Sequence, residues 1–371
     1  MRAKAALLTR VPGKWEICDV EVDDPRDHEV LVRLVATGLC HSDEHFATGD
    51  MPVGTLPYCG GHEGAGVVEA VGPGVVGLSV GDHIVTSFIP ACGRCRWCAS
   101  GMQNLCDLGA QLLTGKQLDG TFRMHLDGVG VGQMGFVGTF AEYSVMPEWS
   151  CIKIDPDIPL KVAAILGCAV PTGWGSAVNA AEVVPGDVVV VAGTGGVGIN
   201  SVQGASHAGA SRVIAADPVQ MKQKAALTLG ATDAVGSIAE AAALARELTN
   251  GQGADSAIVT VGVLKPEHVG EAFSAVRKAG TLVLTSGGNV MEAGLPVGFT
   301  ELVMFQKRIQ GAVYGQMSPT KDVPRLLDMW RAGKLKLEEL ITTTYRLADI
   351  NTAYEDMYAG LNLRGVIEFG A

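Results

Sequence analysis

The stretch GDVVVVAGTGGVGINSVQGASHAGASRVIAADP, residues 186–218, restricts the fold more than any other part of the chain. It combines a buried apolar strand, a glycine-rich turn, a helix of small residues and a second strand, which together make a βαβ unit. Alternation continues to about residue 312, with a helix expected over 267–280 and a strand over 281–288. This order predicts an α/β domain with a doubly wound parallel sheet over 171–312.

The remainder of the chain has a different pattern. From Lys4 to about Met146, short apolar runs are broken by Gly, Pro and Asp, which predicts an irregular antiparallel β domain. The last part contains an amphipathic helix (VPRLLDMWRAGKL) and a strand (RGVIEF) that we expect to return to this domain. A length of 371 residues favours two domains. We therefore predict one domain from 1–170 and 313–371, and a second from 171–312.

Composition excludes several classes of partner. A hydrophobic content of 47% with 18% charged residues is typical of a compact globular protein. The formal charge of -11 argues against broad binding of nucleic acid or of an anionic membrane, which both need clustered Lys and Arg. The N-terminal apolar run is too short for a secretory signal, and no later run approaches about 18 apolar residues. We expect a cytoplasmic protein.

The glycine-rich turn has the spacing of a dinucleotide site. Gly193, Gly195 and Gly198 directly follow an apolar strand, where they permit a tight turn, close approach of a pyrophosphate and close helix packing. With 49 glycines in the chain, a purely structural turn is the alternative. Asp217 follows the next strand, where a carboxylate accepts ribose hydroxyls and repels a 2′-phosphate, so NAD is favoured over NADP. Lys222 either reaches the ribose or is a solvated lysine.

Four cysteines lie within one short loop, the lobe of residues 92–106. They are Cys92, Cys95, Cys98 and Cys106. Nine cysteines without an export signal indicate thiols and metal rather than disulfides. Four thiolates suit a closed, structural zinc site. An iron–sulfur cluster is the main competitor, although ferredoxin spacing differs after the third cysteine; coincident free thiols are the third possibility.

Three further metal-ligand residues stand in separate segments. They are Cys40 in GLCHSDEH, His62 in GGHEGAGVV and Cys168 in GCAVPTGWG. Two cysteines and one histidine with an open fourth position form a catalytic zinc site. Taken singly, Cys168 is equally well explained as a small buried hydrophobe, and His62 as a turn histidine.

Together these motifs, in this order from about Lys4 to Phe369, resemble the zinc-dependent medium-chain alcohol dehydrogenases. The chain also resembles the actinobacterial nicotinoprotein (NDMA-dependent) alcohol dehydrogenases, which keep NAD bound through the cycle. The resemblance implies a β-rich GroES-like catalytic domain, a Rossmann coenzyme domain, and assembly into a dimer or tetramer. It also implies NAD and two zinc ions per subunit, one catalytic and one structural.

The family's functional residues carry over position by position. Cys40, His62 and Cys168 would ligate catalytic zinc, with Glu63 behind it and Asp43 orienting His62. Ser42 would accept the alcohol proton and pass it, through the nicotinamide ribose, to a solvent-facing His45. Phe88 and Phe140 would line the substrate slot or belong to the core. Coenzyme contacts would come from His41, Thr172, Gly193, Gly195, Gly196, Val197, Gly198, Asp217, Lys222 and Arg364.

Two departures from the family pattern affect the coenzyme and the substrate. His41 stands where many relatives have an arginine on the coenzyme pyrophosphate. Arg364 matches the family's other phosphate-binding arginine. The alternative role of Arg364 is that of an ordinary charge on an edge strand. Glutathione-dependent relatives have a basic residue soon after the last lobe cysteine, whereas this chain has none before Lys116. A formaldehyde adduct is therefore a disfavoured substrate.

The main hypothesis is an NAD-dependent zinc alcohol dehydrogenase acting on primary aliphatic, allylic or aromatic alcohols and the matching aldehydes. One alternative is a nicotinoprotein whose bound NAD is reoxidised by an external redox carrier. Another is a zinc-free quinone or enoyl reductase on the same fold, against which the Cys40, His62 and Cys168 set argues. The third is a non-enzymatic relative that binds dinucleotide.

Overall fold

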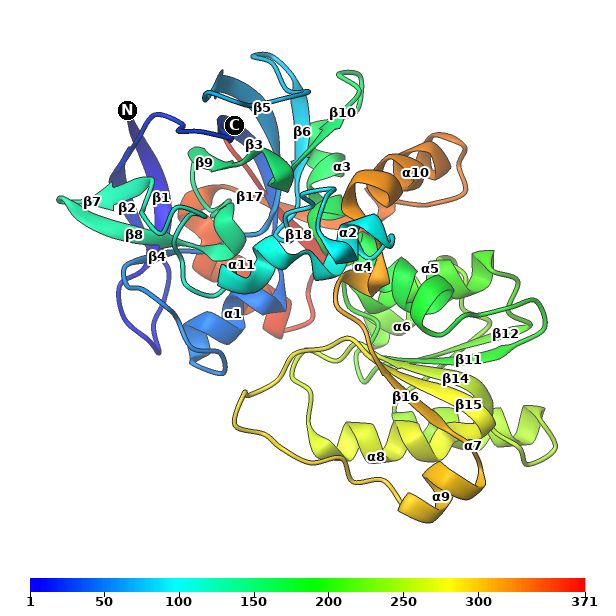
Figure 1. The fold of residues 1–371 in the computed structure, drawn as a ribbon. Helices are drawn as coiled ribbons and strands as arrows, with labels where there is room; N and C mark the ends of the chain where they lie inside the picture. The colour runs from blue at the N-terminus through cyan, green and yellow to red at the C-terminus, as the bar shows by residue number, and fades with distance from the viewer. Residues whose placement is uncertain (371) are drawn as a thin grey trace. The chain divides into compact units, whose positions relative to one another are not determined.

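The computed structural model describes residues 1–370 and divides the chain into two compact units (Figure 1). Unit 1 comprises Met1–Cys168, Ser318–Asp328 and Leu337–Ala371, and unit 2 comprises Ala169–Met317 and Met329–Lys336. The break at Cys168 lies close to the expected one at residue 170. Unlike the expected division, however, residues 329–336 return to unit 2.

Unit 1 contains a small closed barrel. Its strands, in spatial order, are β1 (Arg2–Leu8), β2 (Glu16–Val22), β7 (Met124–Leu126), β8 (Val129–Gln133) and β4 (Tyr58–Cys59), which pairs with β1 again. Trp15, Tyr58 and Phe140 fill its core with small apolar residues. The closure removes free strand edges.

A seven-stranded sheet forms the rest of the β structure of unit 1. Its order is β10 (Cys151–Ile154), β6 (His83–Thr86), β5 (Glu63–Val71), β3 (Glu29–Gly38), β18 (Arg364–Glu368) and β17 (Ile341–Tyr345), with β9 (Tyr143–Pro147) also paired to β3. All pairs are antiparallel except β17 with β18. The central β3 is buried over most of its ten residues, as its run of Val and Leu requires.

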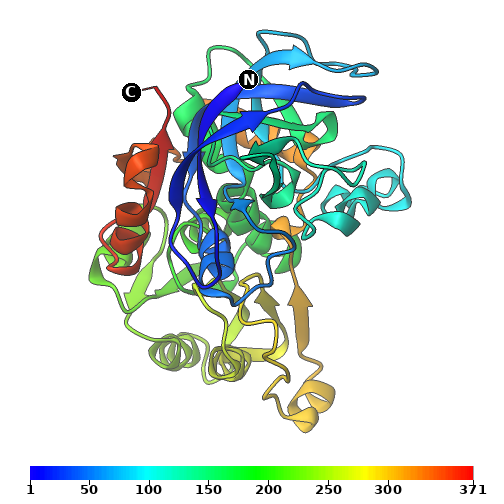
Figure 2. The ribbon, with the colours of Figure 1, turned by 90° about the vertical axis from the view of Figure 1, so that its left-hand side faces the viewer.

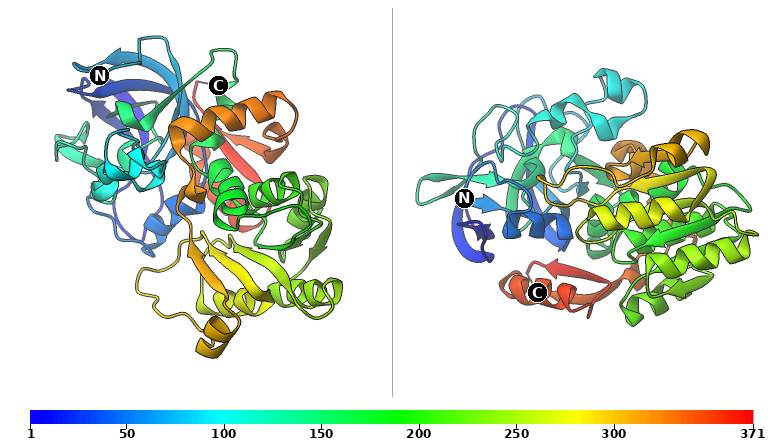
Figure 3. Two further views of the ribbon diagram at one scale, coloured as in Figure 1. Left: turned by 45° about the vertical axis from the view of Figure 1, so that its right-hand side comes forward. Right: turned by 90° about the horizontal axis from the view of Figure 1, so that it is seen from below.

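Five helices accompany these sheets. They are α1 (His41–Thr48), α2 (Arg96–Ala99), α3 (Leu160–Ala164), α10 (Pro319–Arg331), whose end from Met329 belongs to unit 2, and α11 (Ile350–Tyr358). Figure 3 shows α11 beside β17 and β18. In this division β18 and residues 319–328 of α10 belong to unit 1.

Unit 2 is a six-stranded, all-parallel sheet. Its order is β13 (Asp233–Val235), β12 (Arg212–Ala216), β11 (Val188–Ala192), β14 (Ala254–Val259), β15 (Val276–Leu284) and β16 (Arg308–Gly311). Its helices are α4 (Ala169–Gly175), α5 (Gly198–His207), α6 (Gln220–Thr228), α7 (Ile238–Leu248), α8 (Pro266–Ala275) and α9 (Phe299–Met304). This is the doubly wound sheet that the sequence predicts.

Helices cover both faces of this sheet. Val188, Val190 and Ala192 point to the face covered by α7 and α8, and Figure 2 views these two helices end-on. Val189 and Val191 are also fully buried, on the side of β11 that α5 contacts. A strand buried on both faces must be apolar throughout, which explains the run VVVVA.

One helix boundary differs from the expectation. The helix expected over 267–280 ends at Ala275, and residues 276–280 open β15 instead. Val276 pairs with Ala254 across a register shift, so tertiary pairing with β14 outweighs the local helical pattern.

Within the described residues, no single helix has the length and apolar character needed to cross a membrane. One bent pair, Leu160–Gly167 with Ala169–Ala180, meets the length and composition test when its members are joined.

Candidate metal centres and dinucleotide turn

Four potential metal ligands meet in the interior of unit 1. One ligand atom from each of Cys40, His62, Glu63 and Cys168 lies within 4.8 Å of the others, and all four residues are buried. Cys40 directly precedes α1 and His62 directly precedes β5. Cys168 follows a 3-10 turn and has non-helical angles, φ -150 and ψ -68. Three segments distant in sequence thus present soft or borderline ligands to one point.

The orientation of His62 fits a metal ligand. Its Nδ1 faces the Asp43 carboxylate at 3.3 Å, and the same Asp43 oxygen accepts the Gly61 amide at 2.7 Å. The other ring nitrogen, Nε2, is buried and makes no hydrogen bond of standard geometry. A buried ring nitrogen without a partner is unfavourable unless an ion occupies its lone pair, and the carboxylate fixes the required tautomer.

The charge around Cys40 favours a thiolate. A hydrogen bond with Cys168 holds the pKa of Cys40 well below its usual value; burial opposes this shift, while His62 and Arg364 reinforce it. Metal ions bind the thiolate form of cysteine, so the donor chemistry suits Zn2+.

Glu63 lies behind this group and pairs with Arg364. Burial raises the pKa of Glu63 to about 8, although the Arg364 guanidinium opposes the shift. Arg364, at the start of β18, is 5% exposed and donates to Glu63 Oε2. The structure therefore places this predicted phosphate ligand beside the metal-ligand group. The alternative of an edge-strand charge is wrong, because β18 lies between β3 and β17.

The four cysteines of the lobe form a second, separate cluster. Their sulfurs lie within 4.8 Å of one another, with Cys92 to Cys98 at 3.9 Å and Cys95 to Cys106 at 4.0 Å. A tetrahedron of thiolates around zinc has sulfurs about 3.8 Å apart, so the cluster fits the ion closely. Backbone amides also donate to three of these sulfurs, which stabilises thiolates.

The first helical turn of α10 holds the lobe in place. Ser318 Oγ donates to the Gly101 carbonyl at 2.6 Å. Thr320 donates to Gln103 Oε1 through its amide at 3.2 Å and its hydroxyl at 2.8 Å. The lobe is therefore a fixed structural element of unit 1.

The glycine-rich turn joins β11 to α5 in unit 2. A Cβ on Gly198 would collide with the Gly193 carbonyl, so this position admits only glycine. At Gly195 the space is open, and the nearest atom to an added Cβ is Lys222 Nζ at 4.0 Å. Thr194 Oγ1 is buried without a hydrogen-bond partner. An open glycine turn at the start of a ten-residue helix fits a pyrophosphate.

Asp217 ends β12 beside this turn. Its two carboxylate oxygens accept the amides of Thr194 at 2.7 Å and Val219 at 2.9 Å. The residue is 4% exposed, so its charge is held in place next to the turn. Among the other expected coenzyme residues, Val197 precedes α5, Gly196 accepts Asn200 Nδ2, and the Thr172 carbonyl accepts Ser176 Oγ.

The start of α1 carries the remaining residues expected in catalysis. Ser42 Oγ lies 3.6 Å from Cys40 Sγ. The ring of His41 meets the ring of Tyr358 edge-on at 5.6 Å. The expectation that His45 faces solvent is wrong: it is 4% exposed, because α1 turns this face inward, and its Nδ1 lies 3.5 Å from Asp50.

The two phenylalanines expected at the substrate slot lie in different environments. Phe88 is partly exposed and stands edge-on to His62, with ring centroids 5.4 Å apart. Phe140 is fully buried in the barrel core, edge-on to Trp15 at 5.3 Å. We assign Phe140 to the core because Trp15 and Tyr354 surround it.

Comparison with known proteins identifies relatives that match the chain along its whole length. Residues 26–156 match the family model of the alcohol dehydrogenase GroES-like domain, and residues 196–331 match that of the zinc-binding dehydrogenases. An NDMA-dependent alcohol dehydrogenase from Amycolatopsis methanolica is 47% identical over 371 residues, covering 100% of both chains. The chain belongs to the zinc-binding, medium-chain alcohol dehydrogenase family.

Solved structures of family members have the same fold. An alcohol dehydrogenase zinc-binding domain protein from Burkholderia ambifaria is 32% identical with a TM-score of 0.93, covering 100% of both chains. Benzyl alcohol dehydrogenase from Acinetobacter calcoaceticus is 31% identical with a TM-score of 0.92, also covering 100% of both. The chain is accordingly a zinc alcohol dehydrogenase, an oxidoreductase that uses a nicotinamide dinucleotide on small alcohols or aldehydes, as the sequence predicts.

Two contacts near these sites have no signature in the sequence. Tyr358 lies against His41 and donates to Glu44 at 3.1 Å, although α11 is far from α1 in the chain. The pairing of Glu63 with Arg364 spans 301 residues. Neither pair belongs to a local motif, so only the folded chain reveals them.

Proposed function

We propose that this enzyme oxidises primary alcohols, including allylic and aromatic ones, to aldehydes with NAD, and reduces the aldehydes in reverse. Cys40, His62 and Cys168 would hold the catalytic zinc. One observation carries the proposal: two cysteine sulfurs meet a buried histidine nitrogen that makes no hydrogen bond of standard geometry. A bound zinc supplies Lewis acidity that lowers the pKa of an alcohol oxygen.

The chain's own residues orient the ligand and move the proton. Asp43 holds the His62 ring so that Nε2 faces the two sulfurs. Ser42 Oγ, beside the Cys40 sulfur, would take the alcohol proton. His45 lies on the next turn of α1, and its Nδ1 lies 3.5 Å from Asp50 Oδ2. The buried position of His45 makes it a relay within α1 rather than the final outlet to solvent.

Glu63 and Arg364 would tune this site from behind. The carboxylate of Glu63 is fully buried among the ligand atoms, and Arg364 supplies the compensating positive charge. Two thiolates and a carboxylate alone would leave excess negative charge around a divalent ion. We infer that Arg364 limits that excess.

The coenzyme would be NAD, held at the glycine turn of unit 2. NAD supplies the hydride acceptor for the reaction. Asp217 supports NAD over NADP, because a fixed, buried carboxylate next to the turn accepts ribose hydroxyls and repels a 2′-phosphate.

Replacing Asp217 tests coenzyme choice. Asp217→Asn removes the charge at constant size, so we expect the ratio of the dissociation constants for NADP and NAD to fall by about tenfold or more. Calorimetry on protein freed of nucleotide measures both constants. Asp233→Asn, at the neighbouring strand β13, serves as the control and should leave the ratio unchanged. An unchanged ratio in Asp217→Asn would refute the assignment.

We infer two zinc ions per chain, since each of the two clusters fits one ion. The lobe has four sulfurs and no open position, so it would be structural, whereas the Cys40, His62 and Cys168 group would be catalytic. Metal analysis of the purified protein should find two zinc ions. Cys168→Ser should retain one and lose alcohol oxidation, while Cys18→Ser, outside both clusters, should retain two.

A second candidate function is a trapped-coenzyme cycle. The Amycolatopsis methanolica relative is named NDMA-dependent, and it matches this chain end to end. In this form NAD stays bound and an external redox carrier reoxidises it. Denaturing the protein and analysing the supernatant distinguishes the two: near-stoichiometric NAD(H) supports the trapped cycle, and an empty site after gel filtration contradicts it.

The decisive assay for the enzyme class is a screen of alcohols with added NAD and, separately, with an artificial electron acceptor. Turnover with NAD alone indicates an exchanging coenzyme, and turnover only with the acceptor indicates the trapped cycle. Absence of alcohol turnover in both, with two zincs and dinucleotide present, would refute the proposed function.

We also propose a homo-oligomer, assembled through α9 and the adjoining loop of unit 2. Several large apolar side chains there are exposed: Met291 at 85%, Phe299 at 82%, Val303 at 69% and Met304 at 72%. Among the described strands, β16 is the last of its sheet and pairs on one side only, with β15. An apolar patch next to an open strand edge is typical of an interface between subunits.

A further inference from the structure

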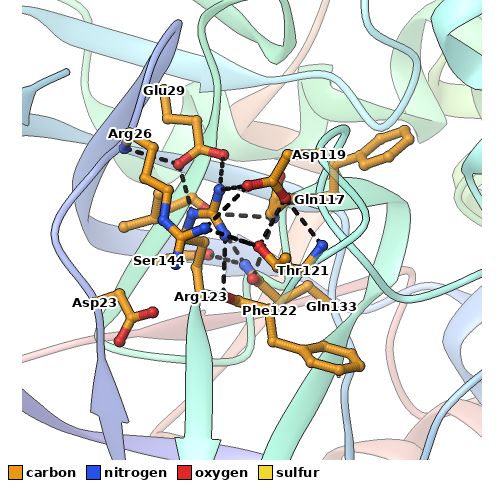
Figure 4. Close-up of polar contacts among 12 residues, drawn as sticks. Asp23, Arg26, Glu29, Gln117, Asp119, Thr121, Phe122, Arg123, Gln133 and Ser144 are labelled. Atoms are coloured by element: carbon orange, nitrogen blue, oxygen red, sulfur yellow. Dashed lines mark hydrogen bonds and ion pairs between the residues drawn. The ribbon is translucent and has the colours of Figure 1, made fainter. Parts of the chain in front are cut away.

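Two amide side chains and one hydroxyl form a buried network in unit 1. Gln117, Gln133 and Ser144 are at most 1% exposed, and Figure 4 shows them joined in the interior of unit 1. Gln117 Nε2 approaches Gln133 Oε1 at 3.1 Å and the Phe136 carbonyl at 2.8 Å. It also approaches the Val145 carbonyl at 3.2 Å. All three neighbours are acceptors, so the amide nitrogen of Gln117 must face them.

This network holds a tight turn in an unusual conformation. Gly135 and Phe136 both have positive φ, 55 and 67 degrees. A phenylalanine rarely adopts such angles without external support. Gln117 binds the Phe136 carbonyl, and Ser144 Oγ binds the next one, of Val137, at 2.5 Å. Two consecutive carbonyls of the turn are thus fixed by buried side chains.

The turn presses directly on Phe88. A Cβ added to Gly135 would lie 2.7 Å from Phe88 Cβ, so glycine is needed for this approach. Phe88 in turn stands at 90° to the His62 ring, with centroids 5.4 Å apart. Contacts therefore run from Gln117 through the turn to Phe88, and from Phe88 to a residue of the metal-ligand group.

From these contacts we propose that Gln117 is a positioning residue that sets the place of Phe88 beside His62 and so determines preference for aromatic over short aliphatic alcohols. The proposal rests on the proposed alcohol oxidation. Phe88 is partly exposed, so part of its side chain can be reached by a planar substrate. If the Phe88 ring is displaced, a planar aromatic alcohol loses its contact with the ring. A two-carbon alcohol is too small to depend on that contact.

A neighbouring ion-pair network supplies the matched control. Arg123 donates to Glu29 through Nε and Nη2, and Nη2 also donates to Asp119 at 2.6 Å (Figure 4). It anchors the same chain segment as Gln117, but within the described residues its hydrogen bonds go to Glu29, Asp119, Thr121 and Phe122 and not to the turn of residues 135–137. Asp119→Asn therefore weakens the segment without releasing the turn.

The test compares substrate preference across variants. Gln117→Met keeps the side-chain volume and removes the donors, so the ratio of kcat/KM for benzyl alcohol to that for ethanol should fall roughly tenfold. The change should appear in KM for benzyl alcohol, with kcat little altered. Calorimetric binding of benzamide, an unreactive planar carbonyl compound, should weaken similarly relative to acetamide, and zinc content should stay at the wild-type value.

Two further variants separate positioning from stability. Ser144→Ala releases the Val137 carbonyl and should shift the same ratio in the same direction; it carries the test if Gln117→Met does not fold. Asp119→Asn should lower stability and leave the ratio unchanged. An unchanged ratio in a folded Gln117→Met or Ser144→Ala, or an equal shift in Asp119→Asn, overturns the proposal. Wild-type protein that oxidises no alcohol refutes the proposed function instead.

Discussion

At the scale of single residues, the metal-ligand group depends on one buried carboxylate. Asp43 is fully buried and serves both the Gly61 amide and the His62 ring. It thereby links the position of the backbone before β5 to the direction in which Nε2 points. Residues that orient a ligand affect metal affinity nearly as strongly as the ligand itself.

We expect Asp43→Asn to weaken retention of the zinc at Cys40, His62 and Cys168 by about 10–100-fold, because a neutral amide no longer orients the histidine. Competition with a chelator, followed by metal analysis, measures the change. Asp50→Asn is the control, since it removes the same charge from a carboxylate that accepts from Thr48 and lies 3.5 Å from His45. Equal zinc retention in Asp43→Asn and wild type would contradict this role.

The sequence predicts these ligands because each lies in a short motif beside a strand or helix end. The three motifs together predict that Cys40, His62 and Cys168 lie close to one another in the folded chain. Gln117 has no such motif: its donors meet carbonyls of a turn whose positive φ at Phe136 is invisible in the residue type. The sequence does not reveal the burial of His45, because that burial depends on how α1 packs.

At the scale of elements, the lobe of residues 92–106 is organised by its sulfurs. It contains the four-residue helix α2 and a 3-10 turn, Gln103–Leu105. Few of its apolar side chains are buried. A segment this short cannot form its own hydrophobic core, so a bound ion would supply most of its order.

Cys98→Ser should therefore reduce the zinc content from two ions to one and lower the melting temperature by about 5 °C or more. Metal analysis and calorimetry measure the two effects, and limited proteolysis should cut within the lobe. Cys18→Ser provides the comparison, because Cys18 lies outside both clusters. Full zinc content in Cys98→Ser would rule out a four-thiolate site.

The Arg123 network makes a second element-level prediction, for acid stability. Partial burial by itself would raise the pKa of Asp119, but hydrogen bonds from Arg123 and Thr121 outweigh it and hold this pKa well below its usual value. A carboxyl whose folded pKa is depressed stabilises the fold above its unfolded pKa of about 3.9 and loses that contribution as the pH falls further.

Asp119→Asn removes this contribution. Because Asp119 is 41% exposed, the loss at pH 6 should be at most about 1 kcal/mol. The difference between wild type and variant in unfolding free energy should then shrink as the pH falls from 6 to 3. Urea unfolding at several pH values measures it, and a difference that stays constant or grows would contradict the assignment.

Element boundaries show what the sequence predicts well. The five-residue strand β11 and the glycine turn after it are recognisable because burial on both faces demands a continuous apolar run. The sequence predicts a helix for residues 276–280 because their pattern continues that of α8. Their pairing with β14 is a non-local preference that local periodicity does not contain.

At the scale of the whole molecule, the exposed apolar side chains of unit 2 predict the state of association. Phe299→Asp places a charge in the proposed interface and should convert the oligomer to a smaller species with the folded circular dichroism spectrum retained. Light scattering measures the mass. Leu361→Asp, at a comparably exposed apolar residue of unit 1, should leave the mass unchanged. Equal masses for wild type and Phe299→Asp would exclude this interface.

The place of β18 in the sheet of unit 1 has a consequence for synthesis on the ribosome. Glu63 emerges early, and its partner Arg364 follows 301 residues later. At elongation rates of about 5–20 residues per second, roughly 15–60 s pass between the synthesis of Glu63 and that of Arg364. Meanwhile the nearly continuous unit 2 leaves the ribosome before unit 1 is complete. A chain truncated shortly before residue 364 should hence have a folded unit 2 and a unit 1 that still lacks its late strand.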